Sequence, residues 1–275
     1  MNQLKNENKD FDNKWGGLIK NKSKEKDEEF SIFVRLGQRP KTQRQFNLFH
    51  YFEYIKTLVE KYNVKNCLEV GCGRGTMSLY LNKHLGLQSS LADRSAEAIE
   101  LAKKNFAKFD AQGEFRNDDA EHLSFEDNIF DMVVSIGLVE HLEDYSKIYA
   151  EKLRVLKPGG VMVSLNIPHK FSVQILNKIY RWFLKLFGRE LKKDYYRNTD
   201  TPRDYKRTAE KVGFQDIETF YVNPFPLFTP VPFFIERLIT ICHSCKYRIR
   251  GMFMKYPFRS NSVCSQAHFL IARKK

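Results

Sequence analysis

The chain has 275 residues, of which 42% are hydrophobic, and its 46 Lys and Arg outnumber its 33 Asp and Glu to give a formal net charge of +13. This hydrophobic content predicts a folded core and excludes a wholly disordered chain. No run of about 18 uncharged apolar residues occurs, which excludes a membrane-spanning helix. The polar N-terminus has no signal-peptide core, so a cytoplasmic protein with reduced cysteines is expected.

The positive charge is concentrated in the C-terminal part of the chain. Residues 168–275 hold 21 basic and 8 acidic residues, whereas residues 1–167 hold 25 of each. Such an excess either attracts an anionic partner or is ordinary solvated surface.

The beginning of the chain predicts a short segment followed by one domain. Residues 1–40 are polar and lack periodicity, and they are expected to form a flexible segment or a lid that docks on the body. Apolar residues at helical spacing predict a helix over residues 43–62. Residues 41–275 are expected to form a single domain.

The stretch CLEVGCGRGT, residues 67–76, is the most informative part of the chain. It predicts a buried strand, a glycine-rich turn and the start of a helix. Glycine lets the backbone turn sharply and approach a ligand closely, and the helix start offers unpaired N–H groups. A turn of this kind after a parallel strand predicts a nucleotide-type binding site.

Alternating strands and helices follow the glycine-rich turn. One apolar run ends at Asp93, about 20 residues past the glycines, where a carboxylate can accept hydrogen bonds from both ribose hydroxyls. A helix over residues 96–109 leads to a third short strand and the sequence DDAEHL at 118–123. Further strands are predicted at 130–135 and 161–167. This alternation predicts an α/β doubly wound sheet.

The sequence here resembles the class I S-adenosylmethionine-dependent methyltransferases, over residues 45–170. Four motifs carry the resemblance in order: LEVGCGRG, LADRS, DAEHLSF and VLKPGG. The glycines alternate instead of following the dinucleotide spacing, and no Gly-Lys-Ser/Thr of a phosphate-binding loop follows them. The resemblance implies a Rossmann-like doubly wound sheet with an antiparallel last strand, and S-adenosyl-L-methionine as the cofactor.

The resemblance also implies roles for particular residues. Cofactor contacts fall on Glu69, Gly71, Gly73, Asp93, Asp119, Ala120 and Ser135. Asp93 would bind the ribose hydroxyls, and Asp119 and Ala120 would meet the adenine edge. The residues alone leave alternatives open. Asp93 could instead cap the next helix, although Ser95 is the better cap candidate, and Asp118 and Asp119 could be turn residues.

The methyl acceptor is expected beyond the fourth strand, beside Glu140 and His141, which are the candidate catalytic residues. Methyl transfer from a sulfonium is an in-line displacement that depends on alignment. A general base is needed only where the nucleophile carries a proton of high pKa. His141 is therefore either a base or substrate contact, or a histidine tied to the backbone. Some quinone-pathway and RNA-end methyltransferases bind a metal through Glu-x-x-Glu-His, but Gly137 replaces the first glutamate here, so no metal is expected.

Two insertions are expected in the C-terminal part, at about 168–198 and 223–261. The first contains a basic amphipathic helix over residues 171–187 with a broad apolar face. In the second, prolines spread over residues 224–234 are expected to exclude a regular central strand or a helix there.

The last elements complete the sheet. A helix over residues 200–212, which ends at a glycine, precedes a sixth strand at 214–222. The final strand at 265–273 would run antiparallel, as the resemblance implies. A C-x-x-C pair at 242–245 lacks the second pair that a zinc site would need, so it is interpreted as incidental.

The favoured function is methyl transfer to a small-molecule or lipid-linked acceptor, by O- or C-methylation. The two insertions would rest on an anionic membrane surface or form an apolar tunnel. One alternative is an RNA methyltransferase, since basic and aromatic residues also suit phosphates and stacked bases. Nucleic acid is less favoured because the aromatics are interleaved with aliphatic runs. The other alternative, a non-catalytic cofactor-binding scaffold, is disfavoured by the intact motifs.

Overall fold

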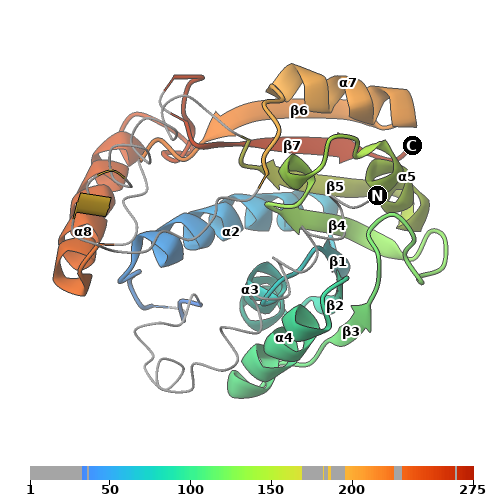
Figure 1. The fold of residues 1–275 in the computed structure, drawn as a ribbon, viewed down its shortest axis with the longest axis horizontal. Helices are drawn as coiled ribbons and strands as arrows, with labels where there is room; N and C mark the ends of the chain where they lie inside the picture. Colours follow the sequence, from blue (N-terminus) through green and yellow to red (C-terminus); the bar gives the residue numbers. More distant parts are fainter. Residues whose placement is uncertain are drawn as a thin grey trace.

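A computed structural model of the chain describes residues 33–35, 37–168, 182, 185–186, 196–225, 231–263 and 265–275. Within these residues, seven strands form one mixed sheet with helices on both faces (Figure 1). The strands are β1 (Asn66–Val70), β2 (Gln88–Asp93), β3 (Glu114–Asn117), β4 (Phe130–Ile136), β5 (Leu156–Asn166), β6 (Gln215–Val222) and β7 (Ala267–Arg273).

The strands lie in the order β3-β2-β1-β4-β5-β7-β6. Strands β1 to β5 are all parallel: β1 pairs with β2 and with β4, β2 also pairs with β3, and β4 also pairs with β5. The carboxyl ends of these strands therefore meet at one edge of the sheet. β7 lies between β5 and β6 and is antiparallel to both, which confirms the expected antiparallel last strand. The strand order reverses between β1 and β4, and ligands of such sheets bind at this switch point.

The helices form two layers that bury both faces of the sheet. They are α2 (Gln43–Tyr62), α3 (Thr76–Leu85), α4 (Ala96–Lys108), α5 (Ser146–Val155), α7 (Pro202–Val212), α8 (Phe233–Gly251) and the short 3₁₀ helix η2 (Val139–His141). One core cluster joins α2, α3 and α4 to the sheet, and includes Phe52 and Phe106. The other joins α5 and α7 to the opposite face, and includes Tyr149 and Tyr205. Adjacent strand residues therefore alternate between the two cores, as a doubly covered sheet requires.

Local sequence signals explain where the helices begin and end. Thr42 and Gln45 form a capping box at the start of α2, whose observed bounds confirm the helix expected over residues 43–62. The Ser95 hydroxyl accepts the Ala98 N–H and caps α4, as expected. Gly213 ends α7 in the left-handed conformation.

The start of α8 corrects one expectation. The prolines over residues 224–234 were expected to exclude a helix, yet α8 begins at Phe233. Pro232 occupies the N-cap of this helix. A proline at this position does not interrupt the helix, because the first N–H groups of a helix have no partner within it.

The N-terminal part of the described chain packs on α3. Phe33 and Val34 are buried, and the Val34 N–H donates to the Tyr80 hydroxyl at 2.9 Å. Residues 1–32 lie outside the described residues. So does the helix expected over residues 171–187, apart from three positions that include the exposed Trp182. No helix within the described part of the chain combines the length and apolar character needed to cross a bilayer.

Candidate active site

The glycine-rich turn after β1 is held in a conformation that suits only glycine. Gly71, Gly73 and Gly75 all have positive φ, at 68°, 53° and 66°. The Gly71 N–H donates to the Ala92 carbonyl at 2.9 Å, which ties the turn to the end of β2. A Cβ on Gly71 would lie 2.7 Å from Leu138 Cδ1, so a side chain there would push on the segment after β4. The turn can therefore present bare backbone to a ligand.

Glu69 links β1, which precedes the glycine-rich turn, to α3, which follows it. Its side chain is buried on β1, and its Oε2 atom accepts the Ser78 N–H of α3 at 2.8 Å. Burial raises the pKa of this carboxyl to about 7. In this position Glu69 fixes the first turn of α3 relative to β1, and so fixes the glycine-rich turn between them.

Asp93 joins the end of β2 to the glycine-rich turn. Its Oδ2 atom accepts the Gly73 N–H at 2.8 Å, and its Oδ1 atom accepts the Ser95 N–H at 3.0 Å. Ser95 caps α4, so Asp93 is not the helix cap that the sequence left as an alternative. Two of the residues predicted to bind the cofactor, 20 positions apart in the chain, are thus within one hydrogen bond of each other.

The DDAEHL segment continues from β3 along the same edge. The Asp118 N–H donates to the Asp93 carbonyl at 3.1 Å, which places this segment beside Asp93. Asp118 Oδ2 accepts the N–H of Ser124 at 3.0 Å, so its carboxylate folds the turn. Asp119 Oδ1 accepts the Glu121 N–H at 2.9 Å, while the Asp119 side chain remains exposed. Each carboxylate therefore accepts a backbone N–H of this turn, and the Asp119 carboxylate stays in contact with solvent.

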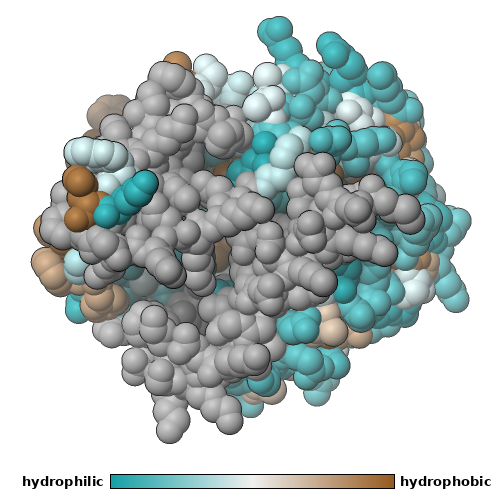
Figure 2. Space-filling view, viewed as in Figure 1, coloured by the Kyte–Doolittle hydropathy of each residue, from teal (hydrophilic) through white to brown (hydrophobic). Residues whose placement is uncertain are grey.

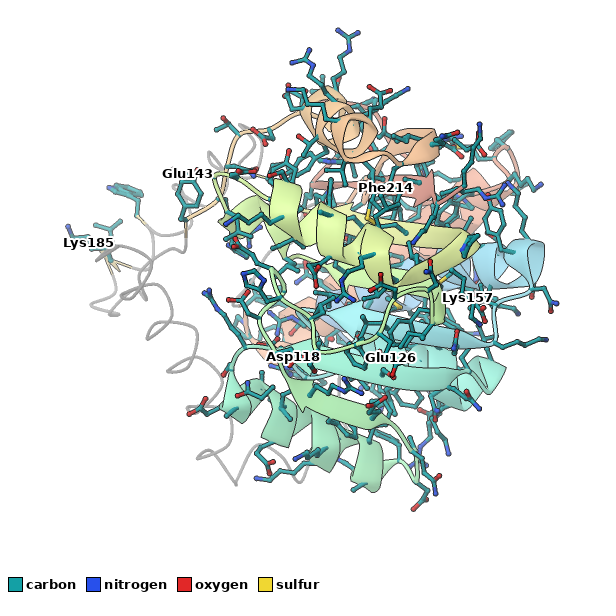
Figure 3. All side chains as sticks on the ribbon, turned by 90° about the vertical axis from the view of Figure 1, so that its right-hand side faces the viewer. Asp118, Glu126, Glu143, Lys157, Lys185 and Phe214 are labelled. Atoms are coloured by element: carbon teal, nitrogen blue, oxygen red, sulfur yellow. The ribbon has the colours of Figure 1, made fainter. Side chains whose placement is uncertain are left out.

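Figure 3 shows this edge from the side. Asp118 and Glu143 lie toward one end of the strands, whereas Lys157 lies toward the other. The segments that follow β1, β2, β3 and β4 all meet at the first of these ends.

The segment after β4 turns at Gly137 and buries Glu140. Gly137 has a φ of +72°, and a Cβ there would lie 3.3 Å from Glu140 Oε1. Glu140 is fully buried, and neither carboxylate oxygen makes a hydrogen bond within the described part of the chain. The Arg197 guanidinium lies 3.8 Å from Glu140 Oε1. Burial raises the pKa of the Glu140 carboxyl above its ordinary value, and Arg197 opposes this. The Glu140 carboxylate is therefore shielded from solvent, with the Arg197 guanidinium as its neighbouring charge.

Residues 196–200, at the C-terminal end of the first insertion, are hydrogen-bonded to η2 and the residue after it. The Asn198 N–H donates to the Glu140 carbonyl at 2.7 Å, and Asn198 Nδ2 donates to the Leu142 carbonyl at 3.1 Å. The Tyr205 hydroxyl donates to Asn198 Oδ1 at 2.7 Å. Sequence reasoning missed this anchor, because a single asparagine after an insertion carries no signal for contacts more than 50 residues away.

His141 is half-buried at the C-terminal end of η2. Its Nδ1 atom lies 2.7 Å from the Tyr196 carbonyl oxygen. A carbonyl can only accept, so Nδ1 carries the proton and, in the neutral ring, Nε2 keeps its lone pair. The histidine is thus tied to the backbone through Nδ1.

The sequence and fold both match known proteins. Residues 68–164 match the family model described as a methyltransferase domain. Norajmaline N-methyltransferase from Rauvolfia serpentina is 35% identical over 111 residues, which cover 38% of this chain and 37% of the relative. Demethylmenaquinone methyltransferase from Listeria monocytogenes is 30% identical over 139 residues, 47% of this chain and 57% of the relative. The chain therefore matches less than two thirds of the length of these relatives.

Solved structures share the same architecture. A candidate sarcosine dimethylglycine methyltransferase from Galdieria sulphuraria superposes with a TM-score of 0.57 and 16% identity, and the match covers 89% of this chain and 94% of that one. Phosphoethanolamine N-methyltransferase 2 from Haemonchus contortus, solved with S-adenosyl-L-methionine, gives a TM-score of 0.51 and 19% identity over 83% of this chain and 57% of that one. Residues 68–164 of this chain therefore resemble a methyltransferase domain. The expected Rossmann-like fold is confirmed.

Within the matched residues 68–164, Ser135 is placed differently from the expectation. It was predicted to contact the cofactor, but its hydroxyl is fully buried and accepts the Lys152 Nζ–H of α5 at 2.6 Å. Ser164 Oγ lies 3.2 Å from the same hydroxyl. The side chain of Ser135 therefore faces the α5 side of the sheet. Lys152 was missed, although it stands four residues after Ile148 and three before Val155, at a core-facing position of the helix.

No metal-binding cluster of three or more His, Cys, Asp or Glu side chains occurs among the described residues. Cys242 and Cys245 are both exposed on α8 and unpaired with each other. Gly137 stands where the metal-binding pattern has its first glutamate, and its positive φ explains why glycine is used there.

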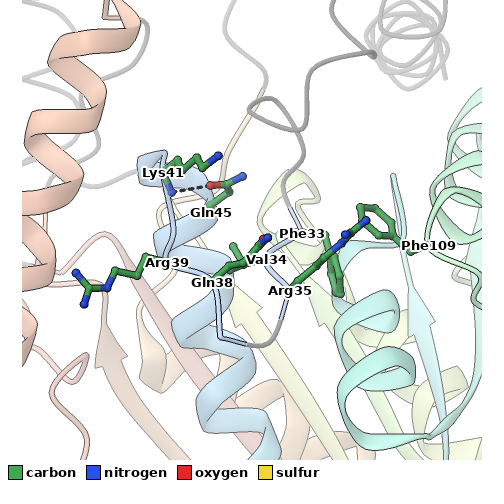
Figure 4. A pocket seen from close by; sticks show the side chains of 8 residues that line it. All are labelled: Phe33, Val34, Arg35, Gln38, Arg39, Lys41, Gln45 and Phe109. Atoms are coloured by element: carbon green, nitrogen blue, oxygen red, sulfur yellow. Dashed lines mark hydrogen bonds between the residues drawn. The ribbon is translucent and has the colours of Figure 1, made fainter.

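A separate pocket lies at the start of α2 (Figure 4). Its basic lining residues are Arg35, Arg39 and Lys41, and Gln45 Oε1 accepts the Lys41 N–H at 2.7 Å. None of the residues predicted to bind the cofactor lines this pocket. It is therefore distinct from the edge at which the glycine-rich turn and Asp93 meet.

Proposed function

We propose that this chain transfers a methyl group from S-adenosyl-L-methionine to a small-molecule acceptor. The hydrogen bond of 2.8 Å between the Gly73 N–H and Asp93 is the observation that carries the proposal. It brings the bare backbone of the glycine-rich turn next to a carboxylate at the switch point of the sheet. The methionine part of the cofactor fits the turn, and its ribose fits Asp93.

The residues present fit this cofactor. A Cβ on Gly71 would clash with Leu138 Cδ1 at 2.7 Å, so only glycine lets the turn pack there with its backbone uncovered. A carboxylate has about four lone-pair sites, so contacts of Asp93 with Gly73 and Ser95 are compatible with hydrogen bonds from ribose hydroxyls. Asp119, exposed on the neighbouring segment, is assigned to the exocyclic amine of adenine, with Ala120 against the ring.

His141 is proposed as the residue on the acceptor side. When bound, the cofactor supplies a methyl group on a sulfonium. The chain aligns the acceptor with it and, where the nucleophile carries a proton, removes that proton. Because the Tyr196 carbonyl holds a proton on Nδ1 of His141, Nε2 is the ring nitrogen assigned to take up the proton of the acceptor.

Glu140 is proposed as a positioning residue. Its carboxylate is fully buried and lies 3.8 Å from the Arg197 guanidinium. Arg197 donates to the Ile167 carbonyl at 2.6 Å, so the pair holds the end of β5 against η2. We propose this role in place of the direct catalytic role that the sequence suggested, because the carboxylate is fully buried beside Arg197.

We propose that the acceptor is a small molecule. A more specific proposal within this class is a small molecule linked to a lipid. One of the two relatives is named as an N-methyltransferase and the other as a demethylmenaquinone methyltransferase. The proposal therefore covers methylation of nitrogen as well as of oxygen and carbon. RNA methylation and a non-catalytic scaffold are the alternatives.

The test is transfer of label from S-adenosyl-L-methionine carrying a labelled methyl group. The purified chain is mixed with lipid, RNA, protein and small-molecule fractions of a cell extract. Label in the small-molecule or lipid fraction supports the proposal, label in RNA favours the alternative, and no label in any fraction contradicts methyl transfer.

His141 is tested in the same assay. His141→Asn keeps a donor near the Tyr196 carbonyl but removes the base, so the rate should fall by about 100-fold or more for an oxygen or nitrogen nucleophile. Cofactor affinity should not change. A rate equal to that of the unchanged chain would exclude His141 as the base.

A further inference from the structure

We propose that α8 and the turn after it dock on an anionic membrane surface. The outward side of this segment is apolar to an extent that is unusual for a helix end in contact with water. Phe234 is 72% exposed and Phe253 is 81% exposed. We define the α8 face as the exposed apolar residues Phe234, Leu238, Ile241, Ile249, Met252 and Phe253.

The spacing of these residues shows that they share one side of the helix. Phe234, Leu238 and Ile241 follow one another at intervals of four and three residues, which keeps them on the same side. Ile249 and Met252 continue the row toward and beyond the C-terminal end. The α8 face therefore consists of an apolar group at each end of the helix, on the same side, with the exposed Cys245 and Arg248 between them.

The opposite side of α8 is anchored to the body of the molecule. Thr240 and His243 are buried, and the His243 ring stacks on Phe225 with centroids 4.8 Å apart. Tyr247 stacks on the His50 ring of α2 at 3.9 Å. These contacts fix which side of the helix points outward, so the α8 face does not turn inward to join the core.

The charges around the α8 face favour an anionic partner. Residues 231–259 contain six Lys or Arg and a single acidic residue, Glu236. Glu236 Oε1 accepts the Gln43 N–H at 3.2 Å, so this carboxylate is directed toward α2. Arg237, Lys246 and Arg248 are exposed on the helix. A surface that combines bulky apolar side chains with basic ones suits the interface of an acidic bilayer.

The α8 face lies near the edge of the sheet that carries the proposed cofactor site. The contact between Gln43 and Glu236 joins the first turn of α8 to the first turn of α2. Figure 1 shows α8 beyond this end of α2, and Figure 2 shows hydrophobic surface on the same side of the molecule. Docking would therefore place the bilayer beside the first turn of α2.

A membrane fits this face better than a second copy of the chain. In a symmetric dimer each copy would present the same basic residues to the other, and the described part of residues 231–259 offers no exposed carboxylate to pair with them. Acidic lipid headgroups supply the missing negative charge, and acyl chains cover the apolar residues.

The experiment is co-sedimentation of the full chain with vesicles. One set contains phosphatidylcholine alone and the other adds phosphatidylglycerol. The unchanged chain should pellet with the acidic vesicles and bind less as salt is raised. The variant Phe234→Ser/Leu238→Ser/Phe253→Ser should lose about tenfold or more in affinity. Val263→Ser, at a residue 74% exposed outside the α8 face, is the matched control and should bind as the unchanged chain does.

Three results would overturn the proposal. The unchanged chain could stay in the supernatant with acidic vesicles, or the triple variant could bind as tightly as the control. In the third, the chain elutes as a dimer that only the triple variant converts to a monomer, which assigns the face to a second copy. Calorimetry with S-adenosyl-L-methionine on every variant separates this proposal from methyl transfer, since loss of docking with unchanged cofactor binding leaves the proposed function intact.

Discussion

The glycine-rich turn and α8 use their side chains in opposite ways. Around the turn, the carboxylates of Glu69 and Asp93 accept backbone N–H groups of neighbouring elements. Along α8, exposed apolar side chains such as Phe234 and basic ones such as Arg237 face outward. The polar groups of the turn find their hydrogen-bond partners within the chain, whereas the exposed apolar side chains of α8 are proposed to be covered by a membrane. The cofactor site and the docking surface are therefore built from different kinds of contact.

The largest effect is expected from a substitution that breaks the turn. Gly75 has a φ of +66°, and a Cβ there would lie 2.6 Å from Leu91 Cδ2 in the core. Gly75→Ala should lower the free energy of unfolding by about 2–4 kcal/mol, because strain and overpacking add. Gly86→Ala is the matched control, since Gly86 has a φ of +70° but no atom within 4 Å of its Cβ position.

Urea denaturation of both variants measures the difference. Gly86→Ala should cost only about 1 kcal/mol, from the left-handed conformation alone. Equal losses in the two variants would show that the space around Gly75 does not matter.

The second effect concerns the anchor on the acceptor side. Asn198→Ala removes the hydrogen bonds to the Leu142 carbonyl and from the Tyr205 hydroxyl. Because it leaves buried polar groups unpaired, it should cost about 2–3 kcal/mol of stability. Cofactor affinity should hold, since Asn198 contacts η2 and not the glycine-rich turn. A calorimetric titration that showed a large loss of cofactor affinity would mean that the two regions are coupled.

The third effect is a pH dependence that comes from Lys152. Burial lowers the pKa of this lysine from 10.5 to about 7. Between these values only the unfolded state binds the proton, so this group makes the free energy of unfolding rise with pH. Lys152→Met should remove that rise and stabilise the chain by about 1–2 kcal/mol near pH 7.

Chemical denaturation at a series of pH values measures the slope, with Lys157→Met, at a lysine 43% exposed, as the control. A slope that survives in Lys152→Met would assign the pH dependence to other groups. Glu69 acts in a separate window, because its pKa is raised from 4.5 to about 7. Between those values the folded state binds the proton more tightly, so its contribution to stability falls as pH rises.

Much of the fold could be predicted from local patterns. The helix over residues 43–62, the cap at Ser95 and the end of α7 at Gly213 each depend on residues near one another in the chain. The coupling of Gly73 to Asp93 also follows from parallel strands ending at one edge. These features need no knowledge of distant packing.

The features that the sequence did not reveal depend on contacts across the chain. The direction of the Ser135 hydroxyl is set by Lys152 on another element. Full burial of Glu140 depends on residues 196–200 folding over η2, which the sequence of η2 does not encode. The start of α8 depends on the position of a single proline, Pro232, at the cap.

The central claim is that the glycine-rich turn and Asp93 hold S-adenosyl-L-methionine. Isothermal titration calorimetry of the full chain with this cofactor and with its demethylated product tests it most directly. Both should bind, and Asp93→Ala should weaken binding of the cofactor by about 1–3 kcal/mol through loss of the ribose contacts, whereas Ala in place of the exposed Glu126 should change nothing. Absence of binding to either ligand, or equal affinity in Asp93→Ala and the unchanged chain, would contradict the account.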